Sequence, residues 1–204
     1  MMRYSYYQGI IFTQHAEFQV TTVANEGNLV AHKGKIIKGE LKEGEEVSIK
    51  INADYRKLYS RLHSAGHLLD IAFHGLGFKN EGTKGYHFPK GSYVEYAGKV
   101  DLKDPKQFIV DMEKKLKDII TMCKTEDAVK AKVYKYEESK EFFKGAIPEH
   151  IPKGADVRVI YLMSLDEGCA CGGTHVNHIK DIGQIKITKA KNAGKAFRVS
   201  YEII

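Results

Sequence analysis

Cysteine is scarce in this chain and follows no regular pattern. The 204 residues contain three cysteines: Cys169 and Cys171 are separated by one residue, whereas Cys123 lies far upstream. An odd count without regular spacing is not a disulfide framework. The pair at 169 and 171 therefore indicates either a metal site or a chance occurrence.

Long apolar runs and targeting signals are also missing. No stretch approaches the roughly 18 consecutive apolar residues that a transmembrane helix needs. The first residues, Met1 to Phe12, are rich in tyrosine and carry one arginine. They lack the charged flank, apolar stretch and small-residue cleavage site of a signal peptide. We therefore expect a cytoplasmic protein that does not associate with membranes.

The composition is that of an ordinary globular protein with a modest basic excess. Hydrophobic residues make up 43% and charged residues 28%, enough for one large or two small domains with a real core. The net charge is +6 and the pI is about 9.0. Within the basic stretch from Lys180 to Arg198, only Asp181 opposes the cations. This stretch is a candidate phosphate-contacting surface; a solvated, lysine-rich strand edge that deters aggregation is the alternative.

Strands at both ends and helices between them predict an α+β fold. The expected strands lie at 9–12, 18–23, 28–32, 46–51, 129–134, 157–163, 183–188 and 197–203, with a hairpin at 84–100. A helix is expected from an Asp54 N-cap to Phe73, another from Asp104 to Cys123, and a short one at 136–144. We expect a small N-terminal β-barrel-like domain over 1–53. An α+β domain with an antiparallel sheet and two long helices should follow over 54–204.

Two histidines lie on one face of the first predicted helix. His63 and His67 are four residues apart, so their imidazoles are about one turn apart and can reach one ion. Such a pair is weak evidence alone, because helices often carry two histidines. The residues between them, Ser64 to Gly66, are small and should leave room for a metal and a substrate above the helix.

The second group of metal-binding residue types is Cys171-Gly-Gly-Thr-His175. The two glycines forbid a regular helix and predict a tight loop that turns a thiolate and an imidazole toward one point. One thiolate and three imidazoles form a tetrahedral zinc set. His175 alone could equally be a buried structural histidine.

Together, His63-Ser-Ala-Gly-His67 and Cys171-Gly-Gly-Thr-His175 closely resemble the editing domain of alanyl-tRNA synthetase. The match is closer still to the AlaX family of free-standing alanyl-tRNA editing proteins. Further segments resemble this family in the right order, so the resemblance runs from Gly9 onward. They are Gly27 to His32, Glu43 to Val47, Gly85 to Phe88, Tyr93 to Tyr96, Ile151-Pro152 and Arg198 to Tyr201.

The resemblance implies a zinc-dependent hydrolase that supports translation fidelity by binding mischarged tRNA(Ala). It would deacylate Ser-tRNA(Ala), with Gly-tRNA(Ala) as a second substrate, by breaking the aminoacyl ester. The zinc ligands would be His63, His67, Cys171 and His175. Cys169 would be an alternate ligand or a redox-sensitive neighbour. A structural-zinc RNA-binding module without catalysis is the alternative function, and a metal-dependent hydrolase of some other aminoacyl or acyl ester is a third.

Substrate contacts follow less directly from the resemblance. Thr83, together with Cys171 and His175, makes up the expected catalytic set, with Thr83 contacting the serine hydroxyl; a surface-turn threonine is the alternative. Thr174 joins Thr83 among the substrate-binding residues, with orientation of the loop as its main expected role. His87, Tyr93 and Glu95 are candidates for the surroundings of the site, with a simple structural role as the alternative for each. Strand alternation places Tyr93 and Glu95 on one face.

The chain also departs from the family pattern. Relatives with an N-terminal barrel carry a glycine-rich segment linked to amino-acid discrimination near their start, and Met1 to Gln8 contains nothing like it. We therefore expect a shortened N-terminal domain and leave activity toward the glycyl ester open.

Overall fold

The computed structural model describes residues 3–4, 9–26, 29–124, 128–143, 147, 151–163 and 167–204. The chain divides into two compact units, Met1–Leu58 and Tyr59–Ile204. No helix in the described ranges is long and apolar enough to cross a membrane. Part of the loop expected around residues 147 to 152 lies outside the described residues.

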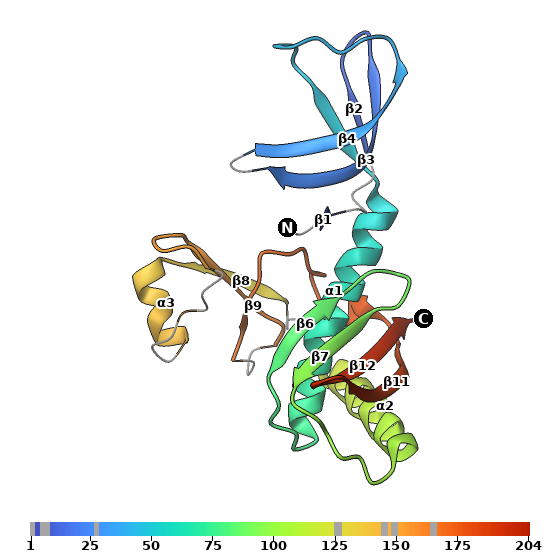
Figure 1. Cartoon of the computed structure of the whole chain (residues 1–204), viewed down its shortest axis with the longest axis vertical. Helices are drawn as coiled ribbons and strands as arrows, with labels where there is room; N and C mark the ends of the chain where they lie inside the picture. Colours follow the sequence, from blue (N-terminus) through green and yellow to red (C-terminus); the bar gives the residue numbers. More distant parts are fainter. Residues whose placement is uncertain are drawn as a thin grey trace. The chain divides into compact units, whose positions relative to one another are not determined.

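The first unit is built on one antiparallel sheet (Figure 1). Its strands are β1 (Arg3–Tyr4), β2 (Gly9–Phe12), β3 (Glu17–Glu26), β4 (Leu29–Lys38) and β5 (Ser48–Ile51). The order is β1-β3-β2-β5, and β4 pairs with β3. Among the strands that the structure describes, no pairing closes this sheet, so the barrel-like form expected from the sequence is not confirmed.

Helix α1 (Ala53–Gly75) begins two residues earlier than an Asp54 N-cap predicted. The Asn52 side chain accepts a hydrogen bond from the Tyr55 amide at 3.0 Å, so Asn52 is the N-cap. The prediction of Asp54 as the cap was wrong, because two residues of capping type stand close together here. Gly77, at a φ of 94°, follows the helix in the left-handed conformation that favours glycine.

The second unit contains a four-stranded antiparallel sheet in the order β11-β12-β7-β6. Its strands are β6 (Gly82–Tyr86), β7 (Tyr93–Ala97), β11 (Ile185–Ala193) and β12 (Ala196–Ile203). β11 extends beyond the predicted end at 188 because a bulge between Ile187 and Lys189 resets its register against β12. The bulge breaks the alternation on which the sequence prediction relied.

Two long helices pack on one face of this sheet. Helix α2 (Pro105–Met122) begins as predicted, with the Asp104 carboxylate capping two amides. Phe73 of α1 stacks on Tyr96 of β7 with ring centroids 4.0 Å apart. Phe108 of α2 meets Phe197 of β12 edge-on at 5.7 Å. In Figure 1 both helices lie behind the sheet, so its other face is turned toward the reader.

A smaller sheet carries the second half of the predicted metal site. Strands β8 (Lys130–Tyr134), β9 (Val157–Tyr161) and β10 (Cys169–Ala170) pair antiparallel in the order β10-β9-β8. Helix α3 (Tyr136–Phe142) follows β8, and the 3₁₀ turn η1 (Ile179–Ile182) precedes β11. Antiparallel sheets with separate helices confirm the α+β class.

Candidate metal centre

Four side chains from two distant parts of the chain meet at one point. His63 and His67 come from α1, and Cys171 and His175 from the loop after β10. Each offers one ligand atom, and these atoms all lie within 4.8 Å of one another. The Cys171 Sγ atom is 3.4 Å from His63 Nε2. The structure therefore brings together all four residues predicted as ligands.

The helix fixes the two histidines relative to each other. Their ring centroids are 5.1 Å apart, as expected for residues one turn apart on one helical face. The His175 ring approaches both, at 4.4 Å from His63 and 4.8 Å from His67. Three imidazoles thus surround a small volume to which the loop adds a thiol.

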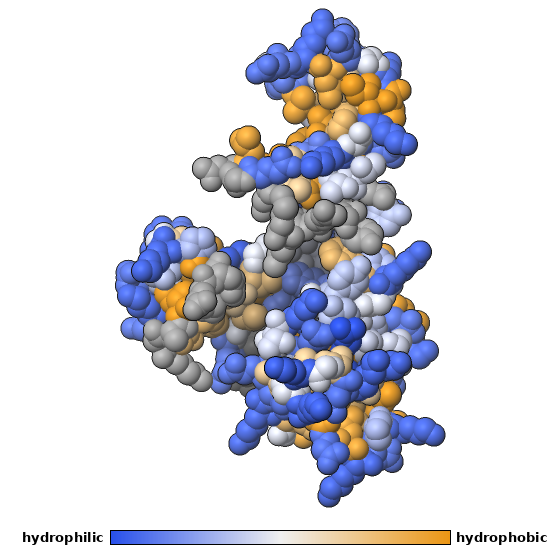
Figure 2. All heavy atoms as spheres, in the orientation of Figure 1, coloured by the Kyte–Doolittle hydropathy of each residue, from blue (hydrophilic) through white to orange (hydrophobic). Residues whose placement is uncertain are grey.

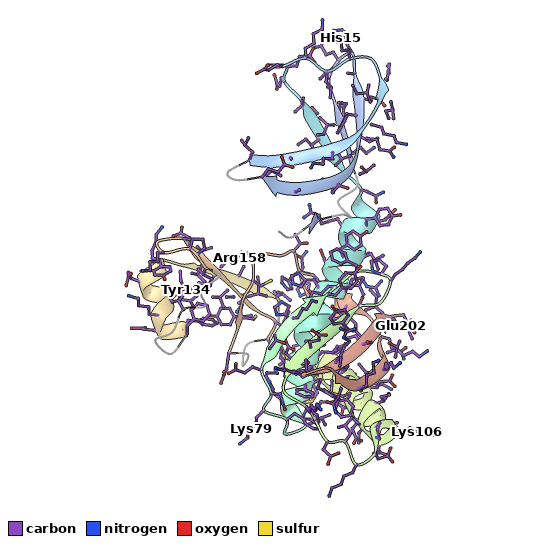
Figure 3. All side chains as sticks on the ribbon, viewed as in Figure 1. His15, Lys79, Lys106, Tyr134, Arg158 and Glu202 are labelled. Carbon is purple, nitrogen blue, oxygen red and sulfur yellow. The ribbon has the colours of Figure 1, made fainter. Side chains whose placement is uncertain are left out.

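Arg158 on β9 holds the loop that carries Cys171 (Figure 3). Its Nη1 atom donates to the carbonyl oxygens of Cys171 and Gly173, each at 2.8 Å. The Cys171 amide donates in return to the Arg158 carbonyl oxygen at 2.9 Å. The Gly173 amide lies 3.4 Å from Cys171 Sγ, so the thiol position is fixed by the loop itself.

Gly173 is required by the closeness of the helix. A Cβ atom at this position would lie 2.5 Å from His63 Nδ1, whereas one at Gly172 would meet nothing within 4 Å. Of the two glycines in the predicted tight loop, only Gly173 is therefore required for the close approach to His63.

Hydrogen bonds set the protonated nitrogen of His63. Its Nδ1 atom lies 3.2 Å from the Thr174 carbonyl oxygen, and a carbonyl can only accept. Nδ1 therefore carries the proton, and Nε2, which lies 3.4 Å from Cys171 Sγ, is unprotonated and can bind a metal once the thiol has lost its proton.

One ring nitrogen of His175 is buried and lacks a hydrogen-bond partner among the described residues. Its Nδ1 atom is 3.0 Å from Ser64 Oγ, which also accepts from the Val176 amide at 3.1 Å. Its Nε2 atom is buried without a hydrogen-bond partner among the described residues. Such a group is costly unless satisfied, and a metal ion between the four side chains would satisfy it.

Burial keeps the imidazoles neutral. Desolvation, followed by the charge of His63, lowers the pKa of His67 to about 3. Burial likewise lowers the pKa of His175 to about 2 and lowers that of His63. Neutral imidazole is the form that binds metal. The donor set of three imidazole nitrogens and one sulfur fits zinc.

The Cys171 thiol is protonated in the absence of a metal. Burial raises its pKa, against the opposing effects of the Gly173 amide and the Arg158 charge. A thiol must lose its proton to bind zinc, so ion binding here would release a proton.

A fourth imidazole, His87, lies against the cluster. It follows β6, and its ring stacks on His63 with centroids 4.9 Å apart. Its Nδ1 atom is 2.7 Å from Tyr201 Oη, whose own proton goes to the Leu62 carbonyl oxygen at 2.8 Å. His87 Nδ1 is therefore the donor and Nε2 is unprotonated. Burial, with smaller effects from His63 and His67, lowers the pKa of His87 to about 3.

The small residues between His63 and His67 on α1 allow other side chains and the cysteine loop to approach the helix closely. A Cβ atom on Gly66 would lie 2.5 Å from His87 Nδ1, and the Ser64 hydroxyl reaches the 174–176 loop. The expected room for a metal is present between the four ligands, but His87 covers Gly66 and the loop covers Ser64, so the space directly above these two residues is filled.

The other predicted site residues lie elsewhere or act through the backbone. Thr83 is exposed at a bulge in β6, where its hydroxyl donates to the Glu95 carbonyl oxygen at 3.2 Å. No interaction recorded for the described residues joins it to the four ligands. Thr174 contacts His63 through its carbonyl oxygen. Tyr93 and Glu95 share a face, as predicted, but on the opposite side of the sheet from the buried Tyr96.

Cys169 lies outside the four-residue group. Its side chain is exposed at the start of β10, whereas Cys171 is half-buried.

Sequence reasoning missed three residues that shape the site. They are Ser64, Arg158 and Tyr201, whose polar groups hold His175, the cysteine loop and His87 respectively. Tyr201 stands in a segment that resembles the editing family, which was the one signal available. For Arg158, an alternating strand gives no such signal.

Comparison with known proteins agrees with the two motifs. Residues 157–198 match the family model of the threonyl and alanyl tRNA synthetase second additional domain. Alanine–tRNA ligase of Rickettsia bellii is 33% identical over 196 residues, covering 88% of this chain and 20% of the ligase. The ligase of Rhodopirellula baltica is 26% identical over 195 residues, covering 93% of this chain and 20% of the ligase. The chain thus spans about one fifth of the ligases that it matches. Over most of its length it resembles the editing-domain region of alanyl-tRNA synthetase, as the two motifs predicted.

Proposed function

We propose that this protein hydrolyses the ester bond of mischarged tRNA(Ala), acting in trans like the AlaX proteins. The seryl ester is the proposed substrate, and the glycyl ester is the second one to test. The observation that carries the proposal is the convergence of His63, His67, Cys171 and His175 in a chain that resembles an editing region.

Zinc is the proposed cofactor. When bound, it supplies Lewis acidity, which polarises a carbonyl oxygen and makes water more acidic. The four side chains would hold it through three nitrogens and one sulfur. The hydrogen bonds from His63 to Thr174 and between His175 and Ser64 support this role, because they orient the rings as partners of metal-binding histidines do.

Groups beside the cluster would orient the substrate. His87 presents an unprotonated Nε2 and is held by Tyr201, so it can accept a hydrogen bond from water or from the amino group of the ester. An aminoacyl ester carries a free amino group, which makes such an acceptor useful. We retain Thr83 as the proposed contact to the serine hydroxyl, with Thr174 supporting the loop.

Discrimination between serine and alanine rests on a single hydroxyl group. A site that hydrogen-bonds this hydroxyl prefers a substrate that carries it, because the polar partner is left unpaired when the hydroxyl is missing. The proposed enzyme would therefore spare correctly charged alanyl-tRNA.

A structural-zinc RNA-binding module is the second candidate. It is favoured by the ligand count, because four protein side chains on one zinc leave no open position of the kind that catalytic sites keep. Hydrolysis of a different acyl ester is a third function to be separated by experiment.

A deacylation assay with seryl-, glycyl- and alanyl-tRNA(Ala) tests all three. Hydrolysis of the seryl ester with sparing of the alanyl ester supports the proposal, and binding without turnover supports the RNA-binding module. No tRNA turnover together with hydrolysis of simple esters supports the third function. If the Cys171→Ala variant stays folded but is inactive, the metal has a catalytic role. If the variant unfolds, the metal has a structural role.

A further inference from the structure

The face of the four-stranded sheet that α1 and α2 leave uncovered carries aromatic and basic side chains. Residues opposite each other in an antiparallel ladder point to the same side. Tyr93 of β7 is paired with Tyr86 of β6, and Glu95 is paired with Lys84 on one side and Arg198 on the other. None of these side chains is buried, whereas the alternating Val94 and Tyr96 are. We call this side the outer face.

Tyr93 is the centre of a stack of flat groups. The Tyr86 and Tyr93 rings lie 5.7 Å apart at 15°, and the Arg198 guanidinium lies 4.0 Å above the Tyr93 centroid. Lys84 Nζ approaches the same ring at 5.9 Å. The Glu95 carboxylate accepts from Arg198 Nε at 2.9 Å and so fixes the guanidinium plane.

Exposed lysines line the edge of the outer face on β11. Lys189 is paired with Ser200 and Lys191 with Arg198, so both point to the outer face, as does Lys186. Lys186 contacts Glu202 at 3.4 Å, and no ion pair is recorded for Lys189 or Lys191 among the described residues. Lys186, Lys189 and Lys191 form what we call the lysine edge. With Lys84 and Arg198 they make five cations against two carboxylates, Glu95 and Glu202.

Figure 2 shows this side of the sheet turned toward the reader and coloured mostly blue to white. A surface that is polar, basic and aromatic together differs from a plain lysine-rich edge, since solubility alone needs no stacked aromatic rings. Aromatic and guanidinium planes stack on bases, and lysines attract phosphates.

The outer face and the metal cluster lie on opposite sides of the sheet and meet at the end of β6. Tyr86 is the last residue of β6, and the next residue, His87, stacks on His63. Consecutive Cα atoms are about 3.8 Å apart. His87 points to the helix-covered side, so a single strand on the outer face would reach the cluster by passing the end of the edge strand β6, next to Tyr86.

We propose that the outer face binds the single-stranded 3′ end of the RNA substrate. Bases stack at Tyr86, Tyr93 and Arg198, while phosphates lie along the lysine edge. An unpaired strand is favoured over a duplex because only unstacked bases can lie on aromatic rings. The inference rests on the proposed function for the direction of the strand, but not for binding itself.

Binding of uncharged RNA tests the surface without any catalysis. A short single-stranded RNA oligonucleotide and a blunt hairpin of equal length would be titrated with the full chain by fluorescence anisotropy. We expect tighter binding of the single strand. The Tyr93→Leu variant should bind it about tenfold more weakly, as removal of one stacking platform predicts.

Lysine variants supply a second readout that does not depend on packing of Tyr93. The double variant Lys189→Gln/Lys191→Gln should reduce the slope of log affinity against log salt by about 1.4, at about 0.7 per lost phosphate contact. The matched control is Lys114→Gln/Lys117→Gln, which removes two exposed lysines from α2 and should leave the slope unchanged.

Equal loss in both lysine double variants, or an unchanged affinity in Tyr93→Leu, would overturn the proposal. Equal binding of the hairpin would overturn its single-strand part. A seryl-tRNA(Ala) deacylation assay on the same variants distinguishes failure of this proposal from failure of the proposed function. If the oligonucleotide binds this face but seryl-tRNA is not hydrolysed, only the proposed enzymatic function is refuted. If seryl-tRNA is hydrolysed and the Tyr93→Leu variant has an unchanged KM, only the proposed RNA binding at the outer face is refuted.

Discussion

His63 Nδ1 donates a hydrogen bond to the Thr174 carbonyl oxygen across 3.2 Å, joining two segments that lie 111 residues apart in the chain. The bond links the helix that carries two predicted ligands to the loop that carries the other two. It also leaves His63 Nε2 unprotonated, 3.4 Å from Cys171 Sγ. The candidate centre therefore depends on how closely the loop approaches the helix.

Adjacent glycines test this closeness. In Gly173→Ala, the new Cβ would lie 2.5 Å from His63 Nδ1, so the loop or the ring must shift. We expect the variant to bind zinc at least about tenfold more weakly, since displacement of groups that orient the ligands has effects of this size. Competition with a chromogenic chelator measures the affinity. Gly172→Ala is the control, because its Cβ meets nothing within 4 Å, and equal losses in both would refute the steric argument.

Much of this arrangement could be predicted because it follows local periodicity. The spacing of apolar residues predicts α1, and the Asp104-Pro105 pair predicts the start of α2. Convergence of the ligands followed from residue types at two motifs. What could not be predicted depends on tertiary contacts. Nothing in an alternating strand marks Arg158 as the anchor of the cysteine loop, and Gly66 gives no sign that His87 covers it.

Ser64 tests whether the partner of a ligand matters. Ser64→Ala removes the hydroxyl that contacts His175 Nδ1 and accepts from the Val176 amide. We expect a loss of about 10- to 100-fold in zinc affinity, the usual effect of losing such a partner. Ser60→Ala is the control, since Ser60 is buried on the same helix one turn earlier and makes no side-chain hydrogen bond to a described residue. A Ser64→Ala variant with unchanged affinity would contradict this role.

Acid should destabilise the metal-free protein through His67. Its pKa is about 3 when folded, against about 6.5 in an unfolded chain. The unfolded chain therefore binds the proton first, and stability falls as the pH drops from about 6.5 toward 3. The contribution of this one histidine approaches about 1.4 kcal/mol per pH unit. Urea unfolding of chelator-treated protein between pH 4 and 7 measures the slope, where the pH limits are chosen around that window.

The His67→Gln variant isolates this contribution, because it should flatten the slope relative to the unsubstituted chain. Replacement of the exposed His15 by glutamine is the control and should leave the slope as it is. A His67→Gln slope equal to that of the unsubstituted protein would show that the buried imidazole is not held neutral.

The two neighbouring cysteines separate metal binding from cysteine chemistry in general. Cys171 belongs to the four-ligand group, whereas Cys169 is exposed outside it. We expect Cys171→Ser to lose most of the bound zinc, because a serine hydroxyl does not replace a thiolate as a soft ligand. Cys169→Ser should keep about one zinc per chain, the content expected for a single site. Elemental analysis after gel filtration gives the metal content of each variant. If Cys169→Ser lost its zinc as fully as Cys171→Ser, Cys169 would have to be a ligand itself, and the loop would have to turn both sulfurs toward α1.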